Sequence, residues 1–307
     1  MQTLYITHPE CRLHEMGDWH PESPFRLDAI NDHLISSGLQ GLLEEREALP
    51  ATEVDILRVH SSKHLEYLRK MSPAEGYAEL DPDTIMNPHT LSAAFAAAGA
   101  GIVAVDAIMK NEAHTAFCSV RPPGHHARPG QAMGFCFLNN LAITVAYTLE
   151  KYGFKRIAII DFDVHHGNGT EEMFNSDARI LMCSIYQDAI FPNVYAQNAG
   201  SNMVNIGVPA NTGGETLRDI VETRWMPQLE DFQPEFIFVS AGFDGHRDDM
   251  LGGLNMHESD YAWITERLVK LADRTAGGRI VSFLEGGYDL SALGRSVAVH
   301  IKALAKL

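Results

Sequence analysis

The segment DFDVHHGNG, residues 161–169, places two acidic residues and a histidine at alternate positions. In an extended chain alternate side chains point to the same side, so Asp161, Asp163 and His165 would share one face. A borderline metal such as Zn²⁺ accepts oxygen and nitrogen ligands together and would neutralise the carboxylates. A solvated strand end that caps a helix would explain a lone DxD pair, but the neighbouring His166 and glycines favour a metal site.

A catalytic zinc ion usually has three protein ligands and one open position. Asp163 and His165 would supply two of them, and Asp244 is the best candidate for the third. It follows the apolar run FIFVSAGF, where an unpaired carboxylate would be costly. Taken alone Asp244 could cap a helix, but together the three residues predict one zinc ion per chain.

Two further motifs contain residues that could transfer or donate protons. The string RPPGHH places His125 and His126 side by side. One imidazole near a metal-activated water can act as general base, and the other can tune its charge or orientation. Tyr288 follows two glycines in EGGY, and its phenol could donate a hydrogen bond to a developing oxyanion. A surface histidine pair and a core tyrosine are the ordinary alternatives for such motifs.

The scaffold that positions these motifs alternates short apolar runs with longer helical patterns. Strands are predicted at residues 4–6, 116–120, 156–161, 180–185, 202–208, 236–241 and 279–284, and helices at 23–37, 91–109, 139–152, 214–232, 259–275 and 289–306. Most strand runs are continuously apolar, as in strands covered on both faces. We therefore predict an α/β fold in one domain over residues 1–307. Its central parallel sheet has helices on both faces and the polar motifs at the carboxyl ends of the strands.

The chain has 24 basic and 40 acidic residues, a formal charge of −16 at pH 7 and no basic run. Binding to nucleic acid is therefore not expected. An acidic surface would attract cationic substrates such as lysine-rich peptides or polyamines, although a high net charge also simply keeps a protein soluble.

The four cysteines are far apart and form no CxxC pair, which predicts free thiols buried in a reducing compartment. No uninterrupted apolar run reaches the ~20 residues that cross a bilayer, and the first residues lack the pattern of a secretion signal. We therefore expect a cytoplasmic protein without membrane partners. The sequence leaves open whether it forms a homo-oligomer.

Several motifs in series resemble those of the histone deacetylase and acetylpolyamine amidohydrolase superfamily. They are WHPESPFRL, RPPGHH, GFCFLNN, DFDVHHGNGT, SAGFD and EGGY, in that order and over nearly the whole chain. The string VHHGNG resembles the corresponding motif of the class II branch. The resemblance implies an arginase-like α/β domain and a zinc-dependent hydrolase. Its substrates would be acetyl-lysine in peptides or proteins or, alternatively, acetylated polyamines and other small acetylated amines.

The same resemblance implies a role for each motif residue. The zinc ligands would be Asp163, His165 and Asp244. His126 would accept a proton from water as general base and return it to the leaving amine, with His125 as its electrostatic partner.

Further roles concern the substrate and a second cation. Tyr288 would polarise the scissile carbonyl. The acyl-lysine tunnel would be lined by Gly134, Phe135 and Phe191. Asp161 would contact His125 and, with Ser184, help to bind a structural K⁺.

Three positions distinguish branches of the superfamily. Asn168 stands where class I members carry an acidic residue, so His126 should titrate lower than in class I. Polyamine-selective relatives have a glutamate seven residues after the third zinc ligand. Leu251 stands there and favours acetyl-lysine peptides, although His246 and Arg247 and the acidic surface leave polyamines open.

Two other functions have less support. An arginase-like binuclear manganese enzyme would need a DxHxD arrangement, but Gly167 stands where its second aspartate would be. A non-catalytic acyl-lysine binding module would be expected to have lost site residues, and every motif position is intact.

Overall fold

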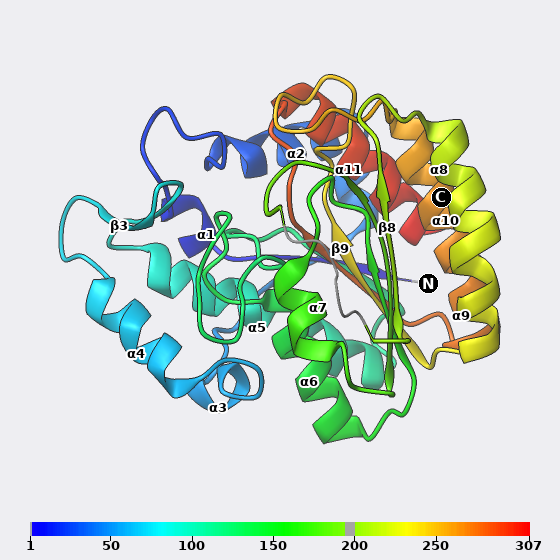
Figure 1. Cartoon of the computed structure of the whole chain (residues 1–307), viewed down its shortest axis with the longest axis horizontal. Helices are drawn as coiled ribbons and strands as arrows, with labels where there is room; N and C mark the ends of the chain where they lie inside the picture. Colours follow the sequence, from blue (N-terminus) through cyan, green and yellow to red (C-terminus); the bar gives the residue numbers. More distant parts are fainter. Residues whose placement is uncertain (1, 194–199) are drawn as a thin grey trace.

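The computed structural model describes residues 2–193 and 200–307, with a parallel sheet at its centre (Figure 1). The sheet has eight strands in the order β2-β1-β5-β10-β9-β6-β7-β8, and each neighbouring pair runs parallel. The strands are β1 (Thr3–Thr7), β2 (Glu44–Glu47), β5 (Thr115–Cys118), β6 (Ile157–Asp161), β7 (Ile180–Gln187), β8 (Met203–Val208), β9 (Phe236–Ala241) and β10 (Ile280–Leu284). The predicted α/β fold with a central parallel sheet is confirmed.

Helices cover both faces of this sheet. Figure 1 shows α5 and α6 on one side of the sheet and α8, α9 and α10 on the other, and α2 packs against α11. The long helices are α2 (Phe25–Ser36), α5 (Thr90–Met109), α6 (Asn140–Tyr152), α10 (Glu258–Thr275) and α11 (Leu290–Leu304). The shorter ones are α1 (Glu10–Leu13), α3 (Glu53–Ile56), α4 (Ser62–Met71), α7 (Asn168–Phe174), α8 (Gly214–Ile220) and α9 (Met226–Phe232).

Several elements differ from the sequence-based expectation, including the short helices α1, α3, α4 and α7, which were not predicted. Strand β2 has the sequence EERE and lies at the sheet edge, where a charged strand needs no apolar pattern. A separate antiparallel hairpin forms from β3 (Ala78–Asp81) and β4 (Thr84–Met86). The helix expected at 214–232 contains a π-helical turn at Val221–Trp225 that separates α8 from α9.

Helix α5 is long and apolar enough, by length and composition, to cross a membrane, and 67% of its apolar window is buried inside the domain. Asp106 interrupts the run of apolar residues within this helix, so a search for uninterrupted apolar runs does not find it. Its small residues allow close packing on neighbouring segments: a Cβ on Gly99 would lie 2.6 Å from the backbone nitrogen of Ala51. Burial in the core therefore explains its apolar composition.

Four neighbouring strands position the polar motifs. β5, β10, β9 and β6 are adjacent in the middle of the sheet, and RPPGHH, EGGY, SAGFD and DFDVHHGNG follow them at their carboxyl ends. Because parallel strands end at the same edge, motifs far apart in the sequence meet there.

Candidate metal centre and active site

Asp163, His165 and Asp244 converge at the carboxyl ends of β6 and β9. One potential ligand atom from each lies within 4.8 Å of the others. Nδ1 of His165 is 3.1 Å from Asp163 and 3.2 Å from Asp244. Both carboxylates are buried. Two carboxylates and one imidazole form a ligand set suited to a catalytic zinc ion.

The chain reaches this arrangement through turns. Strand β6 ends at Asp161, so the expected extended alternation through His165 is wrong. Instead, the N–H of Asp163 donates to Oδ1 of Asp161 (3.1 Å) and the N–H of His165 donates to Oδ1 of Asp163 (2.9 Å). The other carboxylate oxygen of Asp161 accepts from Nδ1 of His125 (3.1 Å), so Asp161 supports the histidine pair.

The neighbouring strand ends approach the cluster closely. The N–H of Gly286 donates to Oδ2 of Asp163 at 2.8 Å, and a Cβ on Gly286 would lie 2.6 Å from that oxygen. The N–H of Val164 donates to Oδ1 of Asp244 at 2.9 Å. Glycine is therefore needed at position 286, because a side chain there would collide with a candidate ligand.

The electrostatics of the cluster favour positive charge. Burial and the neighbouring Asp163 raise the pKa of Asp244 to about 7. Burial opposes the charged form of His165, but Asp163 and Asp244 outweigh it and raise the pKa of His165 to about 10. The proton on this imidazole occupies the place that a metal cation would take.

The two adjacent histidines have opposite electrostatic environments. Burial lowers the pKa of His125, but the charges of Asp163 and Asp161 outweigh it and raise the pKa to about 10. Burial, together with His125 and His165, holds the pKa of His126 well below its usual range. Nδ1 of His126 donates to Oδ1 of Asn168 at 2.8 Å. These surroundings favour the protonated form of His125 and the neutral form of His126, whose Nε2 is free to accept a proton.

A cavity of about 250 Å³ leads to this centre. Its lining includes the three residues that the resemblance placed along a tunnel, and two of the other six, Asp83 and Ile190, had no predicted role. The full set is Asp83, His126, Gly134, Phe135, His165, Ile190, Phe191, Leu251 and Tyr288. Gly134 and Phe135 both have positive φ, +57° and +67°. A Cβ on Gly134 would lie 2.7 Å from the ring of Phe191 and 2.6 Å from that of His126, so only glycine fits at this position.

Tyr288 and Leu251 both line the cavity. The ring of Tyr288 meets that of Phe135 edge to face, with centroids 5.8 Å apart. The guanidinium of Arg26 lies 4.9 Å from the centroid of the Tyr288 ring. These contacts fix the plane of the ring on two sides.

Sequence reasoning did not identify a buried ion-pair network under the EGGY segment. Arg26 donates to the carbonyls of Gly287 (2.7 Å) and Glu285 (2.5 Å). Glu22 pairs with Arg26 and also with Arg121. Arginines are rarely buried completely, so their residue type did not indicate a buried network. Only the position of these residues inside the motifs WHPESPFRL and RPPGHH could have identified them.

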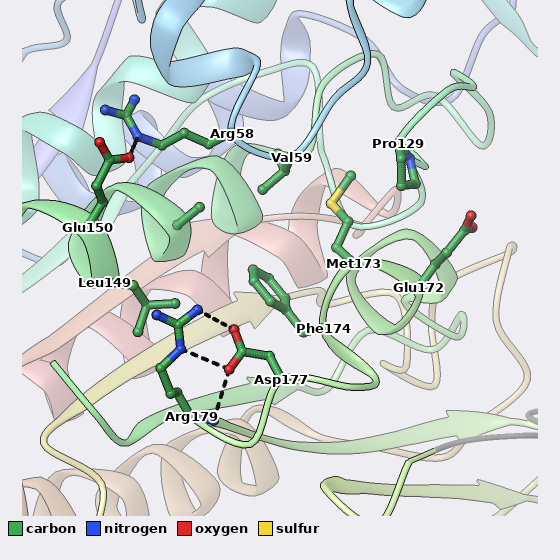
Figure 2. Close-up of a pocket in the computed structure, with 11 residues that line it drawn as sticks. Arg58, Val59, Pro129, Leu149, Glu150, Glu172, Met173, Phe174, Asp177 and Arg179 are labelled. Carbon is green, nitrogen blue, oxygen red and sulfur yellow. Dashed lines mark hydrogen bonds and ion pairs between the residues drawn. The ribbon is translucent and has the colours of Figure 1, made fainter. Parts of the chain in front are cut away.

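A larger cavity, about 590 Å³, lies elsewhere, on the outer side of α6 and α7 (Figure 2). Figure 2 shows that four of its charged side chains pair with one another, Arg58 with Glu150 and Arg179 with Asp177, and Glu172 pairs with Arg128. The smaller cavity is therefore the better candidate site, since it contains the clustered titratable groups.

Comparison with known proteins agrees with this geometry. The model of the histone deacetylase domain matches residues 20–304. The chain belongs to the histone deacetylase family. It is 37% identical to a probable deacetylase of Archaeoglobus fulgidus over 94% of this chain and 82% of that protein. It is also 37% identical to a histone deacetylase-like amidohydrolase of Pseudomonas aeruginosa, over 88% and 73%.

A solved structure extends the match to the fold. The crystal structure of the HDA15 HD domain superposes with a TM-score of 0.93 at 32% identity, covering 99% of this chain and 88% of that one. This family member is accordingly an amidohydrolase, and the arginase-like alternative has no support from the comparisons.

Proposed function

We propose that this amidohydrolase is a zinc-dependent deacetylase that removes acetyl groups from the side-chain amine of acyl-lysine in peptides or proteins. The observation that carries the proposal is the cluster of Asp163, His165 and Asp244 beside a narrow cavity walled by Phe135 and Phe191. The donor set fits zinc, because two buried carboxylates and an imidazole need a shared cation.

Zinc, when bound, would polarise the amide carbonyl and activate the attacking water. Nε2 of His126 would accept the proton of that water, because Nδ1 is held by Asn168. The cationic His125 would stabilise negative charge developing nearby. The phenol of Tyr288 would donate a hydrogen bond to the oxyanion. His126 would then pass its proton to the leaving amine, which departs with acetate as the second product.

The lining supports a lysine side chain as substrate. Phe135, Phe191, Ile190 and Leu251 supply apolar walls that suit four methylene groups. An apolar residue at position 251 cannot pair with the second ammonium group of a polyamine.

Deacetylation of polyamines is a second candidate function, favoured by one observation. Asp83 also lines the cavity, and a carboxylate there could attract a second cation. Comparison of kcat/KM for an acetyl-lysine peptide and for N-acetylputrescine separates the two functions. We expect the peptide to be the better substrate and Leu251→Glu to shift preference toward the polyamine. A higher kcat/KM of the wild type for N-acetylputrescine would refute the argument from Leu251.

We also propose a structural K⁺ site beside the histidine pair. Asp161 and Ser184 are register partners on β6 and β7. Within the described chain the buried hydroxyl of Ser184 has no hydrogen-bond partner. A buried carboxylate together with an unused hydroxyl suits a hard cation.

We further propose that the protein acts in the cytoplasm, a reducing compartment that suits its four buried free thiols.

A further inference from the structure

Asp249 joins the two segments that flank the candidate active-site cavity. It is buried, with 7% of its surface exposed, in the loop that follows Asp244. Its Oδ2 accepts the N–H groups of Tyr288 (2.6 Å) and Asp289 (3.0 Å), and its Oδ1 accepts the N–H of Leu251 (3.0 Å). One carboxylate therefore holds the backbone of two residues that line the cavity, Tyr288 and Leu251.

Tyr288 needs external support because of its chain neighbours. It follows Gly286 and Gly287, and Gly287 has a φ of +122°. Glycines leave the backbone free to adopt many conformations, so this segment does not by itself define where the phenol points. The hydrogen bonds to Asp249 supply that constraint, and bonds to a charged acceptor are stronger than neutral ones.

Capping of helix α11 does not account for Asp249. The N-cap residue of α11 is Asp289, whose own side chain accepts the N–H of Ala292 at 2.8 Å. The side chain of Asp289 therefore already caps the N-terminus of α11. The three hydrogen bonds that Asp249 accepts hold the backbone of the segments beside the cavity.

We propose that Asp249 is a positioning residue that fixes Tyr288 and Leu251 relative to each other, and the proposal rests on the function proposed above. Asp249→Asn tests it, because an amide retains one acceptor oxygen and cannot accept all three N–H groups. The matched control is Asp248→Asn: Asp248 is the preceding residue, and its side chain is 44% exposed.

Both substitutions are made in the wild type and in Tyr288→Phe, and kcat on an acetyl-lysine peptide is measured together with zinc content. In the wild type, Asp249→Asn should lower kcat by about 10- to 100-fold with zinc retained, because the oxyanion donor is misplaced. In Tyr288→Phe it should lower kcat by less than about threefold, because the two changes act through one group. Asp248→Asn should change kcat little in either background. An equal loss from Asp249→Asn in both backgrounds would overturn the proposal.

A second measurement does not depend on turnover. With 3-fluorotyrosine incorporated at position 288, the ¹⁹F resonance should shift or split in Asp249→Asn and stay unchanged in Asp248→Asn. An unchanged resonance in Asp249→Asn would overturn the positioning role. Absence of peptide hydrolysis by the wild type would instead refute the proposed function, and the ¹⁹F spectra would then decide the positioning role alone.

Discussion

Replacement of Tyr288 by Phe removes a single oxygen atom from the wall of the cavity. We expect kcat on an acetyl-lysine peptide to fall by roughly 10²–10³, the usual effect of removing one oxyanion donor. KM and zinc content should change little, because the phenol acts on charge that develops in the transition state.

The structure explains why this loss should be purely catalytic. The described contacts of the Tyr288 side chain are made by its ring, with Phe135 and Arg26, and its backbone N–H bonds to Asp249. A phenylalanine retains all three. The free energy of unfolding should therefore change by less than about 0.5 kcal/mol, while the barrier rises by about 2.7–4 kcal/mol.

Tyr261→Phe is the matched control. Tyr261 is fully buried, and its hydroxyl has no partner within the described chain; it does not line the cavity. Loss of that hydroxyl should leave kcat unchanged and should not destabilise the fold, because no hydrogen bond is broken. Steady-state kinetics and denaturant unfolding of both variants complete the assay. An unchanged kcat in Tyr288→Phe would show that this tyrosine is a packing residue.

Asp163→Ala should abolish zinc retention and turnover together; full zinc occupancy in that variant would contradict the ligand assignment. His126→Ala should lower kcat at least as much as Tyr288→Phe, and a far larger loss in His125→Ala would show that the two roles are reversed. Burial opposes ionisation of Glu258, but the hydrogen bond from Arg295 outweighs it and lowers the pKa from 4.5 to about 2. Because the folded-state pKa is the lower one, this stabilisation is present above pH 4.5 and is lost as the pH falls toward 2. The stability difference between wild type and Glu258→Gln should therefore close over that range, and a constant difference would refute the pairing.

The sequence predicted the central sheet well because its strands are covered on both faces. β9 begins and ends where expected, at Phe236–Ala241, since its apolar run starts directly after Pro234 and Glu235, and Gly242 follows its last residue. Strand β2, with the sequence EERE, was not predictable in this way. It is an edge strand that pairs with β1 alone, and its side chains alternate between half-buried and exposed. An edge strand forms because the neighbouring strand offers unpaired backbone N–H and C=O groups, and the local sequence pattern does not show this.

The candidate ligands were predictable for a different reason. Each follows an apolar strand directly, so the parallel topology alone brings Asp163 and Asp244 to one edge. Asp83 and Asp249 were not predictable, because they lie outside the motifs and the partners of Asp249 include distant residues; Arg26 could have been identified only from its position inside WHPESPFRL. Asp249, for example, acts on a backbone N–H 39 residues away.

The buried carboxylates at the carboxyl edge of the sheet also affect the stability of the fold. Burial raises the pKa of Asp244 and of Glu285 to about 7, and it raises the pKa of Asp161 as well. Buried carboxylates of this kind oppose folding unless protons or cations neutralise them. A cation that binds only the folded state stabilises it by about 2.7 kcal/mol at a hundred times its Kd. Chelation of zinc should therefore lower the melting temperature, by an amount that grows with the logarithm of the zinc affinity. An unchanged melting temperature after verified zinc removal would show that protonation alone accommodates these carboxylates.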